Sequence, residues 1–261
     1  MPSLLQIQKA SIRFGGLTAV SELDLDIGAQ EMVGLIGPNG AGKTTVFNLI
    51  TGVYQPTDGG ILFEGRSIVG CRPYRITARR IARTFQNIRL FPSLSVFDNV
   101  RAVFHVQLRG DVRHALWRGE AYHAEEASIA ARVLELLEIF HLEKFRDEPA
   151  RSLPYGDQRR LEIVRALATS PKLLLLDEPA AGMNPTEKAE LARLIRFVRD
   201  KFQISVLLVE HDMPLVMQIC ERIVVLDYGL KIAEGTPPQI RGNAKVIAAY
   251  LGEDFEAASG K

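Results

Sequence analysis

The chain has 261 residues, of which 47% are hydrophobic and 24% charged, and its formal net charge is +1. This composition is typical of a globular protein with a sizeable core, and so small a net charge gives no reason to expect binding to nucleic acid or to an acidic membrane surface. Two cysteines, Cys71 and Cys220, are too few for a disulfide framework and lack metal-binding spacing, which favours a reducing compartment. Apolar runs such as 173–176 fall far short of the ~20 residues of a membrane helix, so we expect a soluble chain that would reach a membrane through partners.

Near the N-terminus, apolar and polar residues alternate in three segments, at 4–14, 17–27 and 31–37. Alternation with a period of two predicts β-strands, because successive side chains of a strand point to opposite faces. Residues 58–68 predict a further pair of strands that begins with a glycine-containing turn. Residues 46–53 predict a helix that ends at Gly52.

A phosphate-binding motif follows the third of these strands. Residues 37–44, here called the phosphate loop, read GPNGAGKT and fit the pattern G-x-x-x-x-G-K-[ST] between a predicted strand and a predicted helix. Glycines let backbone N–H groups curve around phosphates, and the helix directs its positive dipole end at them. We expect Lys43 to reach the β- and γ-phosphates and Thr44 to offer a hydroxyl to Mg²⁺. A chance glycine-rich turn would rarely combine this strand, spacing and Lys-Thr pair, so the motif predicts binding of a nucleoside triphosphate.

The pattern becomes helical from about residue 96 to residue 142, most clearly at 120–142, where Ala, Leu and Glu recur at helical spacing. Residues 109–119 are basic, contain the single Trp, and are expected to form a loop or a short helix. We interpret the four histidines of this region as surface residues; they are His105, His114, His123 and His141.

After Pro149 the pattern returns to alternating strands and helices. Three short segments are apolar throughout their interior, at 172–178, 204–210 and 222–227, as the central strands of a buried parallel sheet are. Helices are predicted between them and before them, at about 158–170 and 186–200.

The first two of these strands carry candidate catalytic residues at or just after their ends. Asp177 and Glu178 end the first, at the edge of an open sheet where ligands bind. There Asp177 can hold the Mg²⁺ shell, and Glu178 can act as a general base on the attacking water. His211 follows the next strand and can hydrogen-bond a γ-phosphate. Surface Asp-Glu pairs and strand-end histidines are common, and only the nearby phosphate loop favours the functional interpretation.

Together these features resemble the ATP-binding cassette of ABC transporters over nearly the whole chain. The resemblance implies an α/β P-loop NTPase (RecA-like) core with a mainly parallel sheet, at about 1–95 and 150–261. It also implies an antiparallel β subdomain and an inserted α-helical subdomain at about 96–149. The guanine-reading motif N-K-x-D is not found in the sequence, which argues against a GTPase.

The resemblance also assigns roles to single residues. Phe14 would stack on adenine, Gln86 would contact Mg²⁺ and water, Glu178 would be the catalytic base, and His211 would orient water and the γ-phosphate. Thr44, Gln86 and Asp177 would hold Mg²⁺, with Asp177 acting through water. The residues expected to bind ATP are Phe14, Gly37, Pro38, Asn39, Gly40, Ala41, Gly42, Lys43, Thr44, Thr45 and Asp177.

The family's signature segment, normally L-S-G-G-Q, would cap the ATP of the opposite subunit. Here the corresponding residues are Leu153, Pro154, Tyr155, Gly156, Asp157 and Gln158, so the usual serine and first glycine are replaced. Pro154 offers neither a hydroxyl nor a backbone N–H. This altered signature, with stretches such as RTFQNIRLF and DEPAAGMNP, is similar to one ATPase of the branched-chain amino acid importers.

Importers of this kind imply a second ATPase, expected to be a non-identical sister, two membrane permeases, and, indirectly, a periplasmic amino acid binding protein. The chain would then lie at the cytoplasmic face of a bacterial inner membrane and use ATP and Mg²⁺. The alternatives are the ATPase of lipopolysaccharide export, a non-transport cassette acting on DNA or ribosomes, and a P-loop kinase. The chain has one cassette, no coiled-coil arm with a heptad repeat and no excess of basic residues, which argues against a cassette acting on DNA or ribosomes. The sequence shows no evident site for an acceptor substrate, which argues against a kinase.

Overall fold

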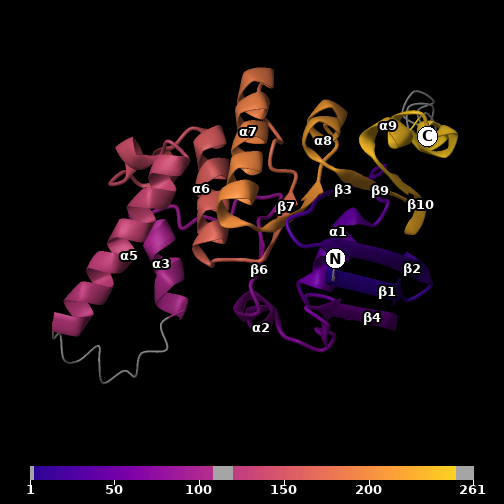
Figure 1. Cartoon of the computed structure of the whole chain (residues 1–261), viewed down its shortest axis with the longest axis horizontal. Coiled ribbons are helices and arrows are strands. Elements are labelled where there is room, and N and C mark those ends of the chain that lie inside the picture. The colour runs from indigo at the N-terminus through magenta and orange to yellow at the C-terminus, as the bar shows by residue number, and fades with distance from the viewer. Residues whose placement is uncertain (1–2, 108–119, 251–261) are drawn as a thin grey trace. The chain divides into compact units, whose positions relative to one another are not determined.

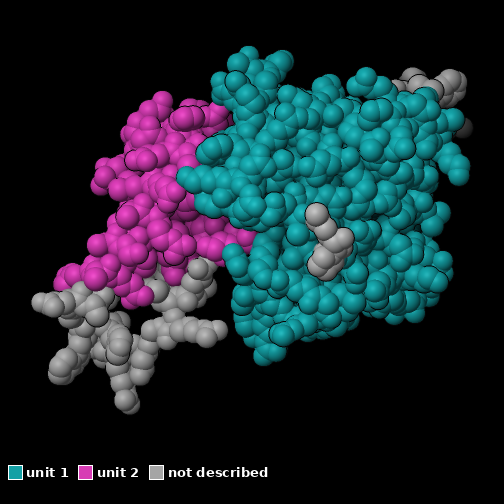
Figure 2. Space-filling view, in the orientation of Figure 1, with its two compact units in different colours: residues 1–83, 172–261 teal, residues 84–171 magenta. Residues whose placement is uncertain are grey.

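The computed structural model describes residues 3–107 and 120–250 (Figure 1). The chain divides into two compact units, residues 1–83 with 172–261 and residues 84–171 (Figure 2). The expected helical subdomain, 96–149, falls inside the second unit, which also contains the predicted signature segment. Among the helices described, none has both the length and the apolar character needed to cross a membrane.

An antiparallel sheet forms one layer of the first unit. Its strands have the order β2-β1-β4-β5 and comprise β1 (Ser3–Phe14), β2 (Leu17–Gly28), β4 (Asp58–Phe63) and β5 (Arg66–Ser67). The alternation of the sequence is visible in the burial of β2, where Leu23, Leu25 and Ile27 are buried between exposed polar residues. These strands confirm the prediction made from the period of two.

A mainly parallel sheet forms the other layer, with the strand order β10-β9-β3-β8-β7-β6. Its members are β3 (Met32–Ile36), β6 (Ile81–Arg83), β7 (Leu173–Asp177), β8 (Ser205–Val209), β9 (Arg222–Asp227) and β10 (Leu230–Gly235). Only β10 runs antiparallel to its neighbour in this sheet. Strands β7 and β8 are buried along their whole length, as their apolar sequences predicted. Strand β3 is also buried along its whole length, although the sequence analysis predicted an alternating strand there.

The core of the first unit lies between the two sheets and around helix α1 (Lys43–Ile50). Alternate residues of the parallel strands enter it, for example Val33 and Leu35 of β3. In Figure 1, α7 (Pro185–Phe202) and α8 (Met213–Ile219) lie on the face of the parallel sheet opposite α1. Because α1 lies on one face of the parallel sheet and α7 and α8 lie on the other, apolar and polar residues do not alternate along its central strands.

The remaining elements of the first unit are short. They include α2 (Pro73–Ala78) and α9 (Pro237–Arg241), and residues 244–250 are helical as well. The sequence analysis missed α2 and α9, together with α8, β6 and β10. A three-residue strand such as β6 carries no readable period, and its place in the sheet depends on pairing with β7.

The second unit is helical among its described residues, as expected. It contains α3 (Val96–Gln107), α5 (Glu120–Ile139), α6 (Tyr155–Ala168) and the 3₁₀ turns Glu143–Phe145 and Ala150–Ser152. Apolar residues of the three helices, among them Val100, Val133 and Leu161, form its buried interior. Helix α6 begins at Tyr155, three residues before the predicted start, because Pro154 fits the position that precedes a helix. His123 and His141 are exposed as expected, whereas the expectations for 109–119, His105 and His114 lie outside the residues and side chains described.

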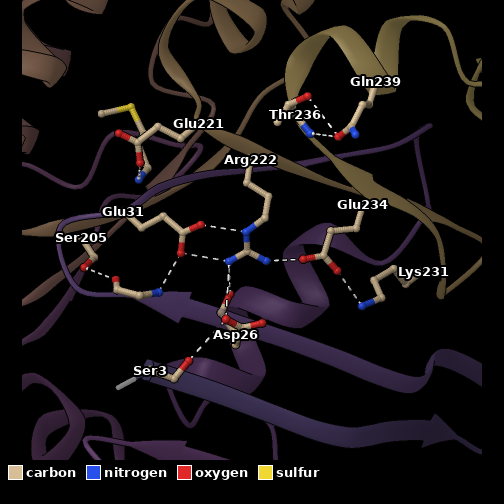
Figure 3. A network of polar contacts seen from close by, with 12 residues as sticks. Ser3, Asp26, Glu31, Ser205, Glu221, Arg222, Lys231, Glu234, Thr236 and Gln239 are labelled. Carbon is tan, nitrogen blue, oxygen red and sulfur yellow. Dashed lines mark hydrogen bonds and ion pairs between the residues drawn. The ribbon is translucent and has the colours of Figure 1, made fainter. Parts of the chain in front are cut away.

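One arginine connects four segments of the first unit (Figure 3). Arg222 of β9 donates hydrogen bonds to both carboxylate oxygens of Glu31, at 2.7 and 2.9 Å, and to the backbone oxygen of Asp26 in β2, at 2.6 Å. It also pairs with Glu234 of β10, whose carboxylate accepts a hydrogen bond from Lys231 at 2.8 Å. The network therefore joins the edge of the antiparallel sheet to the parallel sheet.

The pKa values of Glu31 and Glu234, the two carboxyl groups that bind Arg222 most closely, are lowered from their ordinary range. Burial raises the pKa of Glu31, but the hydrogen bonds from Arg222 and from the Gly28 N–H outweigh burial and lower the pKa overall. For Glu234, burial also raises the pKa, and the bonds from Lys231 and Arg222 outweigh it. Lowered pKa values mean that this stabilisation is complete above the unfolded pKa, near 4.5, and is lost as pH falls through the lower folded values.

We predict that Arg222→Met lowers the free energy of unfolding by about 2 kcal/mol at pH 7, because hydrogen bonds to charged groups are lost. The difference from the unchanged protein should shrink as pH falls through the lowered folded-state pKa values of Glu31 and Glu234 and both carboxyls become protonated. Urea unfolding at several pH values measures both effects. Arg13→Met is a control with a much smaller expected loss, since Arg13 and its partner Asp58 are 58% and 59% exposed. Equal losses for the two variants would contradict the prediction.

Candidate functional site

The phosphate loop connects β3 to α1, and its backbone requires glycine at two points. Gly37 has φ +151°, and a Cβ atom there would lie 2.0 Å from the backbone oxygen of Leu226. Gly42 has φ +100°, and a Cβ atom there would lie 2.7 Å from the backbone oxygen of Ala19. The loop thus takes a curved path, packed against β9 and β2, that side chains at these positions would prevent.

The helix that follows this loop directs its N-terminus at the loop. Gly42 caps α1 without any side-chain hydrogen bond, so no side chain covers the N-terminal end of the helix, where an anion is favoured. Lys43 is only 9% exposed, and its Nζ donates to the backbone oxygens of Gly37 and Pro38 at 2.6 and 2.7 Å. Thr44 is exposed, Thr45 is half-buried, and Asn39 and Gly40 are exposed at the tip of the loop. The arrangement presents a cation and N–H dipoles to an anion.

Parallel pairing brings the other predicted groups of the first unit to the same edge. Leu35 of β3 pairs with Val209 of β8, and Val209 pairs with Asp177 of β7. The three strands therefore end level, and the phosphate loop, His211 and Glu178 all follow their carboxyl ends. This is the position at which open parallel sheets bind ligands.

Asp177 is 2% exposed and is held by an arginine that the sequence analysis did not identify. Arg83 of β6 donates through Nη2 to Asp177 Oδ2 at 2.8 Å and through Nη1 to Asn48 Oδ1 of α1 at 2.7 Å. Arg83 and Asp177 side chains are 7% and 3% exposed, so this ion pair is buried. It ties the end of β7 to the helix of the phosphate loop.

Glu178 and His211, two of the predicted catalytic residues, lie close to each other. His211 Nδ1 lies 3.9 Å from Glu178 Oε2, and the side chains are 64% and 20% exposed. Glu178 has a φ of +48°, a conformation that non-glycine residues adopt rarely and that clusters at functional sites. Its backbone N–H donates to the oxygen of Val209 at 2.9 Å, which keeps it beside β8.

A buried carboxyl group, Glu210, orders the segments around this pair. It is 1% exposed and accepts hydrogen bonds from the backbone N–H groups of Ala180, at 2.8 Å, and His211, at 3.2 Å. Burial raises the pKa of Glu210, although these N–H groups and His211 oppose the rise. Glu210 was not predicted to have a role, because its partner Ala180 lies on a different strand connection, 30 positions away in the chain.

Phe14, predicted to contact the base, has an aromatic neighbour. The Phe14 and Tyr54 ring centroids are 5.1 Å apart with an interplanar angle of 69°, an edge-to-face pair. Both rings remain accessible, at 44% and 37% exposure. Tyr54 was missed because it follows α1 at a distance of forty residues from Phe14 in the chain.

Gln86 and the predicted signature residues belong to the second unit. Gln86 is exposed, and its backbone oxygen accepts a hydrogen bond from Arg159 of α6. Leu153 is buried, Pro154 precedes α6 without a side-chain cap, and Tyr155, Gly156, Asp157 and Gln158 form the first turn of that helix. Gln158 closes the turn by donating to the Leu153 oxygen at 2.8 Å.

The residues of the first unit fit a magnesium ion bound with a nucleotide. No group of three or more His, Cys, Asp or Glu side chains that could hold a metal occurs among the residues described. Mg²⁺ in nucleotide sites does not need such a group, because phosphates and water supply most of its ligands. The exposed Thr44 hydroxyl suits direct coordination, and Asp177, with one oxygen bound by Arg83, suits coordination through water.

We predict that Arg83→Met lowers the free energy of unfolding by about 3 kcal/mol, because it removes the cation from a buried carboxylate. Adding Asp177→Asn removes the charge that the variant leaves behind, so the double variant should recover part of this loss. Chemical denaturation of the two single variants and the double variant tests both statements. A loss below about 1 kcal/mol for Arg83→Met would contradict them.

Comparisons with known proteins agree with this geometry. Residues 20–181 match the family model described as ABC transporter, and residues 231–256 match the one described as branched-chain amino acid ATP-binding cassette transporter. The high-affinity branched-chain amino acid transport ATP-binding protein LivG of Escherichia coli K12 is 45% identical over 96% of this chain and 98% of its own length. The lipopolysaccharide export system ATP-binding protein LptB of the same organism is 39% identical over 93% and 94%.

Among solved structures, the ADP conformation of an ATP-binding cassette of an ABC transporter has a TM-score of 0.83 and 26% identity, covering 97% of this chain and all of that one. Its likeness confirms the predicted α/β P-loop fold with its parallel and antiparallel sheets. The family match spans most of the chain and includes the phosphate loop, Asp177 and Glu178. The chain therefore belongs to the ATP-binding proteins of the ABC transporter family and is an ATPase of that family.

Proposed function

We propose that this ATPase powers the import of branched-chain amino acids across a bacterial inner membrane, at whose cytoplasmic face it binds two permeases. The observation that carries the proposal is the match of residues 231–256 to the branched-chain amino acid cassette model. The altered signature at 153–158 supports it. Lipopolysaccharide export is the alternative, and its ATP-binding protein has the lower identity, 39% against 45%.

Binding of ATP would begin at the phosphate loop. Lys43 Nζ holds the oxygens of Gly37 and Pro38. Phosphate oxygens would replace these neutral acceptors, and the resulting charge-assisted bonds are stronger than those they replace. The N–H groups at the start of α1 would receive the remaining phosphate charge. Residues 37–45 thus form the anion site.

The adenine would rest against Phe14. Its ring is partly exposed and is fixed by the edge of Tyr54. An aromatic ring held in this way offers a base a flat, preformed surface at little entropic cost. We assign Tyr54 a positioning role in the same site.

Hydrolysis would use Glu178 as the general base. The Glu178 carboxylate takes a proton from the attacking water as the water oxygen bonds to the γ-phosphorus and the bond to ADP breaks. His211, 3.9 Å away, would orient the water and donate a hydrogen bond to the γ-phosphate. Mg²⁺, held by Thr44, Gln86 and, through water, Asp177, would neutralise phosphate charge.

The partners follow from the same proposal. A second ATPase subunit, a non-identical sister, would bind its ATP under residues 153–158 of this chain. The permeases would contact exposed apolar residues of the second unit, where Phe91 is 48% and Leu94 is 39% exposed. Val96, close to them in the chain, is buried and belongs to the core of the unit, so it would not take part. A periplasmic binding protein would deliver the amino acid to the permeases.

We predict that Glu178→Gln binds ATP with unchanged affinity but hydrolyses it at least ~100-fold more slowly, because the amide cannot accept the proton. Phosphate release by the assembled transporter and binding of a fluorescent ATP analogue measure the two quantities. Glu138→Gln on the exposed side of α5 is the matched control and should retain full activity. Normal turnover in Glu178→Gln would rule out this residue as the base.

A further inference from the structure

Four polar residues of α6 gather on one face of the helix. Tyr155, Arg159, Glu162 and Arg165 follow one another at spacings of four, three and three, which places them in one row. They face the backbone of residues 85–91, here called the glutamine segment because it contains Gln86. Both parts belong to the second unit.

Arg159 is the centre of this row. It is 3% exposed, and its guanidinium donates to the backbone oxygens of Phe85, at 2.7 Å, and Gln86. It also donates to the Tyr155 hydroxyl from Nε, at 3.1 Å, and from Nη2, at 2.8 Å. One planar group therefore connects the first turn of α6 directly to the backbone of Gln86.

Glu162 completes the attachment from the acceptor side. It is 5% exposed and accepts hydrogen bonds from the backbone N–H groups of Phe85, at 3.2 Å, and Arg89, at 3.4 Å. It also pairs with Arg159 at 3.3 Å. The buried Arg159 and Glu162 thus form an ion pair with each other. Together they also bind both carbonyl oxygens and N–H groups of the glutamine segment.

The far end of the glutamine segment is fixed as well. Arg165 donates to the backbone oxygen of Arg89, and its guanidinium lies 4.9 Å from the Phe91 ring centroid. Asn99 of α3 is fully buried and exchanges hydrogen bonds with the N–H and oxygen of Phe91, at 2.9 and 3.0 Å. The segment is therefore bound along its length to the helices of its own unit.

We propose that Tyr155 and Arg159 are positioning residues that couple the signature segment to Gln86. The inference rests on the proposed function, in which residues 153–158 meet ATP held by the partner and Gln86 serves the ATP held by this chain. A shift of the Tyr155 hydroxyl then changes the position of the Arg159 guanidinium, which donates a hydrogen bond to the Gln86 carbonyl oxygen. This coupling accounts for a tyrosine in the signature, since glycine at position 155 would supply no hydroxyl to Arg159.

The test uses Tyr155→Phe, which removes only the hydroxyl, and Arg159→Lys, which keeps the charge but loses the planar fork. Tyr74→Phe is the matched control, because the Tyr74 hydroxyl also accepts a hydrogen bond from an arginine, Arg75, at 3.3 Å, but on α2. Each variant is assayed in the transporter assembled with its membrane partners. The readouts are kcat and KM for ATP, and hydrogen exchange of the amides at 85–89.

We expect both variants to raise amide exchange at Phe85 and Arg89 by roughly tenfold and to lower kcat by roughly threefold to tenfold, on the scale of one lost hydrogen bond. KM for ATP should stay unchanged, since the phosphate loop is untouched, and Tyr74→Phe should alter neither quantity. Three results would overturn the proposal. The first is unchanged amide exchange at 85–89, and the second is faster exchange spread evenly over α3, α5 and α6. The third is faster exchange at 85–89 with an unchanged kcat. The exchange readout needs no hydrolysis. An unmodified transporter that fails to hydrolyse ATP would therefore refute the proposed function, and the local exchange would still test the attachment itself.

Discussion

The level alignment of β3, β8 and β7 in the parallel sheet is the constraint on which the candidate site depends. Pairing of Leu35 with Val209 and of Val209 with Asp177 fixes where each strand ends. The connections that follow these ends carry the phosphate loop, His211 and Glu178, so groups far apart in the chain converge at one edge. Because the strands are buried along their whole length, their register is strongly specified, and with it the spacing of the site.

Buried polar groups then hold the connections in place. Arg83 joins Asp177 to Asn48, and Glu210 joins the backbone after β7 to the backbone after β8. In the second unit, Arg159 and Glu162 do the same for the backbone around Gln86. Buried charges are costly unless they are paired and hydrogen-bonded. Arg83 and Arg159 pair with the carboxylates of Asp177 and Glu162, and Glu210 accepts hydrogen bonds from backbone N–H groups. The common result is a set of loops whose backbone is fixed before any ligand arrives, as catalysis by preorganised groups requires.

The sequence predicted those parts of the site that short-range patterns encode. Spacing within eight residues identified the phosphate loop, and an apolar run ending in Asp177 and Glu178 identified the strand end. Arg83, Glu210, Tyr54 and Arg159 were not predicted, because each acts through partners distant in the chain; Arg83 and Asp177, for example, are 94 positions apart. The fold was predicted in its long elements, whereas β6, β10, α2, α8 and α9 are too short to show a period. Segment 153–158 lacks the usual serine and first glycine of a signature. Its residues 155–158 form the first turn of α6, and its tyrosine accepts a hydrogen bond from Arg159.

Import of branched-chain amino acids is the activity proposed for this chain, and an uptake assay measures it most directly. The chain would be purified with its membrane partners, reconstituted in vesicles with ATP on its own side, and supplied with the periplasmic binding protein on the other. The account predicts ATP-dependent accumulation of labelled leucine, isoleucine and valine, with none for lysine. Hydrolysis of ATP without accumulation of any branched-chain amino acid would contradict it.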